Sequence, residues 1–183
     1  MDEPLPKRHC PRWSELPELA LYMDQVRIVL DDALTASSAP APAPAVTATM
    51  INNYVKQKLV APADRKKYSR EHVSRLILIC TLKQVLSLSE ITAVLDELSA
   101  AHGPADGYDL FCGSLEAQLA GEPLPESCPE LLAAALCALE GKLRVVRLVS
   151  ARAAARTDAE RTAEKPKPRS RERAKPAASA AEK

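Results

Sequence analysis

"SREHVSRLILICTLKQVL" (residues 69–86) is too apolar to form a surface helix. Five consecutive apolar residues occupy positions 76–80, and together with their neighbours they cover most of the circumference of a helix. Ser69 is placed to cap the helix, and Glu71 lies in its first turn near the positive end of the helix dipole. We therefore predict that residues 70–86 form the central helix of the core.

Helical patterns also surround this stretch. Ser87 and Glu90 form a capping box that opens a second helix over residues 88–100. Upstream, "ELPELALYMDQVRIVLDDAL" (residues 15–34) repeats apolar residues at three- and four-residue steps, from Leu19 and Tyr22 onward, which predicts a helix. Downstream, we expect one short helix ending near Gly121 and a long one opened by a second capping box, Ser127 with Glu130.

Composition agrees with a mostly all-α fold. The chain has 183 residues, of which 46% are apolar and only 3% aromatic, so its core must be aliphatic. It has no apolar run long enough to span a membrane and no signal peptide at its start, so we expect a cytoplasmic protein without a membrane partner. Five cysteines without a CxxC pair indicate buried structural thiols and no metal site.

Charge is unevenly distributed along the nearly neutral chain. Residues 49–83 carry eight basic and two acidic side chains, whereas residues 84–150 carry three basic and ten acidic ones. A basic segment between acidic flanks is typical of a surface that binds a polyanion.

The basic segment contains a series of landmarks in a fixed order: Met50–Lys58, Leu59, Val60, Pro62, Arg65–Tyr68, Ser69 onward, Ser87 and Glu90 with Ile91. This order resembles the DNA-binding domain of the MerR family. In that family a recognition helix leads through two leucines and a proline into a basic wing, and a helix starting at Tyr-Ser follows. "LPELALYMDQV", "TMINNYVKQKLV" and "KKYSREH" also resemble an uncharacterised bacterial family of small cytosolic proteins. The resemblance to the MerR family implies a winged helix-turn-helix. The wing is reduced, because "ADRKKY" is short.

These observations divide the chain into five parts. We predict an N-terminal helix over 1–35, an Ala/Pro linker over 36–45, a winged helix-turn-helix-like domain over 46–100, a C-terminal helical region over 101–156 and a disordered basic tail over 157–183.

The leading hypothesis is a transcriptional regulator that reads duplex DNA. Asn can pair with adenine in the major groove, Lys can contact guanine or phosphate, and the basic turn can hold the DNA backbone. The predicted DNA-binding residues are Thr49, Asn52, Asn53, Lys56, Lys58, Arg65, Lys66, Lys67 and Tyr68. The opposing hypothesis is a protein-interaction module on the same scaffold, without DNA binding.

A heptad-like pattern in the last helix has two interpretations. The seam of Leu132, Leu136, Leu139, Leu143 and Val146 could join two copies into a symmetric dimer, or it could cover the core of its own domain.

Enzymatic chemistry is not expected. His9, His72 and His102 have no partners at ligand or triad spacing, and no glycine-rich phosphate loop or nucleophile elbow is present. We interpret His72 as finishing the first turn of its helix, and we expect no cofactor.

Overall fold

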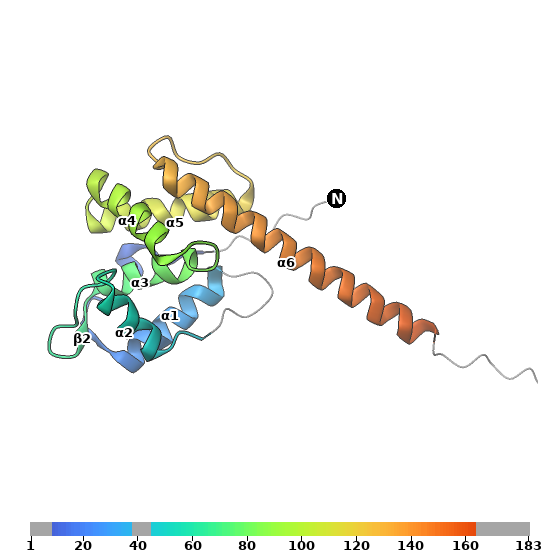
Figure 1. The fold of residues 1–183 in the computed structure, drawn as a ribbon, viewed down its shortest axis with the longest axis horizontal. Helices are drawn as coiled ribbons and strands as arrows, with labels where there is room; N and C mark the ends of the chain where they lie inside the picture. The colour runs from blue at the N-terminus through green and yellow to red at the C-terminus, as the bar shows by residue number, and fades with distance from the viewer. Residues whose placement is uncertain (1–8, 38–44, 164–183) are drawn as a thin grey trace, which may run out of the picture. The chain divides into compact units, whose positions relative to one another are not determined.

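The computed structural model describes residues 9–37 and 45–163, and it confirms a mostly α-helical fold (Figure 1). The elements are the 3₁₀-helix η1 (Trp13–Glu15), strand β1 (Leu21–Tyr22), helices α1 (Met23–Ser37) and α2 (Ala48–Lys56), strand β2 (Lys67–Tyr68), and helices α3 (Arg70–Leu82), α4 (Leu88–Ala101), α5 (Pro104–Ala120) and α6 (Glu130–Ala163). The described residues up to Leu148 form one compact unit, and the later part of α6 belongs to a second.

Helix α3 is the central helix of the first unit, as predicted, but it ends at Leu82 and not at residue 86. Eight of its 13 residues are buried, and α1 and α5 both pack against it. His72 occupies the N3 position, where its Nδ1 accepts a hydrogen bond from the Ser69 backbone N–H (3.0 Å). The prediction that His72 finishes the first turn is therefore confirmed. Helix α4 opens with the predicted Ser87–Glu90 capping box.

The first predicted helix begins later than expected. Residues 15–22 contribute the end of η1 and strand β1, and α1 starts only at Met23. The two residues of β1 pair in antiparallel register with β2, Leu21 opposite Tyr68 and Tyr22 opposite Lys67. This pairing satisfies backbone groups that a helix would have used, and it leaves Leu19 and Tyr22 exposed.

The segment before α1 is held on α5 by hydrogen bonds that span about a hundred residues of sequence. Glu116 accepts from the Cys10 backbone N–H (2.7 Å) and pairs with the Arg12 guanidinium (2.5 Å), and Asp109 accepts from the Trp13 N–H (2.6 Å). Residues 9–22 and the part of the predicted C-terminal region that ends at Leu148 thus belong to one unit.

Helix α5 has 17 residues and is longer than the short helix expected there. Gly103 is its N-cap and Pro104 its first residue, a position where the missing N–H of proline costs nothing. A Cβ at Gly107 would stand 3.3 Å from Leu98 Cγ, so glycine there allows α4 and α5 to approach closely. The predicted end near Gly121 is confirmed by its left-handed backbone (φ 72°).

Helix α6 is longer than expected and covers the core. It continues to Ala163, through residues predicted to be disordered, while residues 164–183 of the predicted tail and 38–44 of the predicted linker lie outside the described part. Four seam residues are almost fully buried within the chain's own core: Leu132 (0% exposed), Leu136 (1%), Leu139 (1%) and Leu143 (6%). The fifth, Val146, is half-buried. Of the two interpretations of the seam, the structure therefore favours packing on the same chain over a dimer.

Replacing Leu139 and Leu143 together by Glu should unfold the first unit. Both side chains are buried, so the variant would place two unpaired charges in an aliphatic core, at a cost of several kcal/mol. Circular dichroism during urea titration measures the loss. The matched control is Val145→Glu with Leu148→Glu, at exposed positions of the same helix, which should change stability little. A stably folded Leu139→Glu, Leu143→Glu variant would contradict this packing.

Candidate nucleic-acid interface

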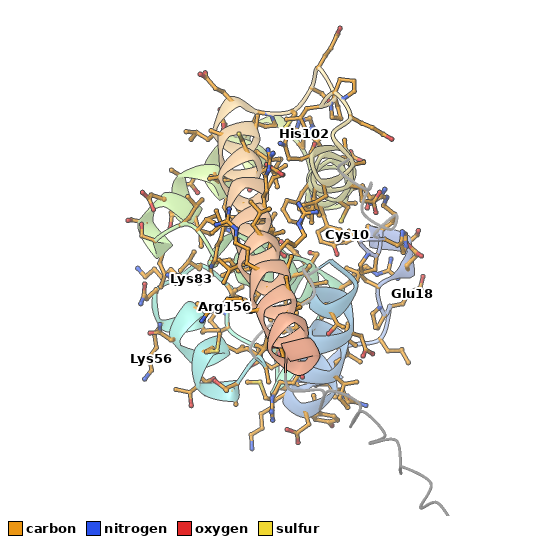
Figure 2. All side chains as sticks on the ribbon, turned by 90° about the vertical axis from the view of Figure 1, so that its right-hand side faces the viewer. Cys10, Glu18, Lys56, Lys83, His102 and Arg156 are labelled. Atoms are coloured by element: carbon orange, nitrogen blue, oxygen red, sulfur yellow. The ribbon has the colours of Figure 1, made fainter. Side chains whose placement is uncertain are left out.

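Helix α2 presents a polar face and buries an apolar one. Thr47 caps it by accepting a hydrogen bond from the Met50 N–H (3.2 Å). Ile51 and Tyr54 are buried against the core. The predicted contact residues of this helix, Thr49, Asn52, Asn53 and Lys56, are all exposed. Figure 2 shows the Lys56 side chain projecting away from α2.

The entry into α2 is fixed by side chains of α1. Arg27 Nε donates to the Val46 carbonyl (2.9 Å), and the Val46 N–H donates to Asp31 Oδ1 (3.1 Å). These two bonds hold the start of α2 against α1, as a short turn between consecutive helices would do. The sequence pattern gave no signal for them, because they depend on contacts 15 and 19 residues apart.

In the turn after α2, a lysine adopts a conformation that favours glycine. The Lys58 N–H bonds the Val55 carbonyl (3.0 Å) and the Leu59 N–H bonds the Tyr54 carbonyl (3.0 Å), which together form a Schellman motif. Lys58 takes the left-handed position of that motif, with φ 60°, and is exposed. The predicted helix Met50–Lys58 is therefore shifted, since α2 covers 48–56 and Lys58 lies in the turn after it.

The predicted wing is a hairpin with a two-residue turn. Backbone hydrogen bonds join Asp64 and Lys67 in both directions (3.0 and 2.8 Å). The turn residues Arg65 and Lys66 both have positive φ, 47° and 65°, as in a type I′ turn, where Asn-Gly is the preferred pair. Both side chains are exposed at the tip.

Several contacts anchor this hairpin to the rest of the unit. His72 Nδ1 accepts a hydrogen bond from the Ser69 N–H, so the ring proton is on Nε2. The Nε2–H group donates a hydrogen bond to the Pro62 carbonyl (3.3 Å). The Lys67 ammonium lies 5.2 Å from the centre of the Tyr22 ring, a cation–π distance. Tyr68, predicted to contact DNA, is instead buried, with its ring edge-to-face against His72. Its role is to anchor the hairpin.

The side chains of two further arginines of the basic segment contact other parts of the protein. The Arg70 guanidinium stacks over the Trp13 ring (5.8 Å) and pairs with Glu18 (3.3 Å). Arg75 Nε donates to the Leu59 carbonyl (2.5 Å) and so supports the turn that contains Lys58. The exposed cations of the predicted site are consequently Lys56, Lys58, Arg65, Lys66 and Lys67.

The cysteines do not form a metal site in the part of the chain that the structure describes, where no three potential ligand side chains come together. A hydrogen bond with the Cys112 thiol, and burial, raise the pKa of Cys10, and burial raises the pKa of Cys80 to about 12. Thiols with raised pKa values are poor nucleophiles. Cys137 is exposed, contrary to the prediction of buried thiols. Within residues 9–37 and 45–163, no helix has the length and apolar content of a membrane span.

A family model described as a domain of unknown function (DUF1836) matches residues 11–111. The chain belongs to this family. The DUF1836 match runs from the segment that docks on α5 through α1, α2, the hairpin, α3 and α4 into α5, and it includes every exposed cation of the candidate surface. No curated protein and no solved structure matches the chain.

Replacing Lys58 by Gly should stabilise the DUF1836 domain. A non-glycine residue in the left-handed region costs about 1–2 kcal/mol, and the extra freedom of glycine in the unfolded chain returns part of this, so we expect a net gain of about 0.5–1 kcal/mol in the free energy of unfolding. Urea titration measures it. The same change at Lys56, inside α2, should instead destabilise by up to about 1 kcal/mol. Loss of stability in both variants would refute strain at position 58.

Proposed function

We propose that the exposed surface of α2, its C-terminal turn and the hairpin binds duplex DNA. The observation that carries the proposal concerns backbone strain. Among the described residues, the three non-glycine residues with positive φ are Lys58, Arg65 and Lys66, and all are exposed cations of this one surface. Glycine would fit these positions with less strain, so a fold selected for stability alone would not keep cations there.

Charge at strained positions is explained by an anionic partner. When a cation neutralises a phosphate of the DNA backbone, counterions are released, and this favours binding. The binding free energy gained in this way offsets the backbone strain at these three residues. The hairpin is also well held, by strand pairing, by the buried Tyr68 and by the link between His72 and Pro62. Arg65 and Lys66 are thus presented on a preorganised support, which lowers the entropy lost when the complex forms.

Helix α2 supplies groups that can read bases. Asn52, Asn53 and Lys56 are exposed and lie within little more than one turn of each other. An asparagine amide pairs with the adenine edge in the major groove, and lysine contacts guanine or phosphate. Phosphate contacts from the hairpin would set the position of α2 on the duplex, and the asparagines would supply sequence preference.

The resulting proposal is a transcriptional regulator with a MerR-like winged helix-turn-helix whose wing is reduced to one tight turn. Supporting it are the order of α1, α2, the hairpin, α3 and α4, and the bonds that fix α2 on α1. We place this protein in the cytoplasm, where such a regulator meets DNA.

One observation favours a different partner. Val145 and Leu148 are exposed apolar residues of α6 (60% and 51%). Such residues suit a protein contact, and a second copy of the chain is one candidate partner. In this second candidate function the scaffold is a protein-interaction module, and its basic surface has no role in recognising DNA.

The DNA hypothesis is tested by fluorescence anisotropy of the full chain with a random 20-base-pair duplex over a range of salt concentrations. Simultaneous Lys56→Ala, Lys66→Ala and Lys67→Ala substitutions should weaken binding and reduce the slope of log affinity against log salt by about one for each phosphate that is no longer neutralised. All three side chains are exposed, and strand pairing and the buried Tyr68 still hold the hairpin when the Lys67–Tyr22 contact is lost, so folding should be preserved.

The control removes three exposed cations elsewhere, Lys83, Arg152 and Arg156, and should leave the salt slope nearly unchanged. An equal reduction of affinity in both triple variants would mean that binding follows total charge and not this surface. If the parent shows no affinity for DNA even at low salt, the interaction-module function takes precedence.

A further inference from the structure

A cavity of about 360 Å³ opens between α3, α4 and the start of α5. Its volume lies within the range of small-molecule sites. One wall is apolar and includes Leu78, Leu95 and Leu98, which are buried. His102, labelled in Figure 2, stands at the corner between α4 and α5. Nothing in the proposed DNA function uses this cavity.

The polar wall of the cavity carries one charge of each sign. Glu71 and Arg75 both line it, and they lie four residues apart on α3, so their side chains emerge on the same face of the helix. Arg75 is half-buried and Glu71 is exposed. A guanidinium fork is matched by a carboxylate, and a glutamate carboxylate is matched by an ammonium group.

We propose that this cavity binds an apolar α-amino acid or a closely similar zwitterion. The ligand carboxylate would meet Arg75, its ammonium group would meet Glu71, and its side chain would lie on Leu78, Leu95 and Leu98. A simple anion would place a second negative charge beside Glu71, and a simple cation would place a second positive charge beside Arg75. A zwitterion with an apolar side chain satisfies both charged groups and the leucine wall.

Arg75 also connects the cavity to the turn after α2. Its Nε–H donates to the Leu59 carbonyl, and Leu59 follows the left-handed Lys58 in the Schellman motif. A second cavity, of about 290 Å³, is lined by Lys58, Leu59, Glu71 and Arg75, so the two charged residues stand between the ligand cavity and this turn. A carboxylate that engages the Nη groups of Arg75 would pull on the Leu59 bond and change the environment of Lys58.

The probe for this site is L-phenylalanine, titrated into the full-length ¹⁵N-labelled protein without DNA and followed by amide chemical shifts. The expected result is saturable binding, with shifts at residues lining the cavity and also at Lys58 and Leu59. Phenethylamine, which lacks the carboxylate, and 3-phenylpropionate, which lacks the ammonium group, should each bind at least about tenfold more weakly. Equal binding of all three compounds would overturn the zwitterion assignment, as would the absence of saturable binding.

Variants assign the two charges. Arg75→Gln should weaken L-phenylalanine binding about tenfold and leave phenethylamine binding unchanged, and Glu71→Gln should weaken L-phenylalanine binding similarly and leave 3-phenylpropionate binding unchanged. The matched control is Asp96→Asn, because Asp96 is an exposed carboxylate of α4 that does not line the cavity. This substitution should not change L-phenylalanine binding. Ser99→Trp, at an exposed position lining the cavity, should fill it and abolish binding while the circular dichroism spectrum is retained. Unchanged binding in Ser99→Trp would place the ligand elsewhere and overturn the assignment.

These measurements contain no DNA, so they are separate from the test of the proposed function. Binding of L-phenylalanine with shifts at Lys58 supports the site even if the basic surface proves not to bind DNA. Conversely, DNA binding without any ligand response would overturn the site alone.

Discussion

The burial of α3 is the constraint on which the rest of the first unit depends. A helix that is apolar on most of its circumference cannot be covered by one neighbour, so α1 packs on one part of it and α5 on another. The segment before α1 then reaches α5 and is held there by Glu116 and Asp109. The proposed DNA surface and the cavity both lie next to α3, because the charged side chains in its first turns are not buried in the core.

This constraint also explains how the basic segment is divided between structure and surface. Arg70 and Arg75 belong to α3 itself, where their long side chains can lie along the protein and satisfy partners such as Glu18 and the Leu59 carbonyl. The cations that precede α3 stand on α2, the turn after it and the hairpin, which pack only on one side. Net charge alone does not distinguish these two groups of cations, but the strained positions at 58, 65 and 66 all belong to the exposed group.

Local patterns predicted the elements whose signals are local. The apolar run of α3, the capping box of α4 and the glycine that ends α5 each act within a few residues, and each was found. Pairs distant in sequence were not, including β1 with β2 and Glu116 with Arg12. At the candidate site the exposed polar residues were identifiable from charge and spacing. The buried position of Tyr68 was not, because only the packing of β2 against His72 sets it.

The side-chain chemistry of position 75 explains why an arginine, and not a lysine, suits the link between turn and cavity. An arginine donates through Nε to one partner while its two Nη groups address another, in a fixed plane. A lysine ammonium is a single point charge on a flexible stem and cannot hold partners on opposite sides with the same geometry. With Nε directed to the Leu59 carbonyl and the residue lining both cavities, Arg75 can transmit a change at its Nη end to the backbone next to Lys58. A short, planar and charged connection of this kind needs no movement of α3, whose buried face is fixed by the core.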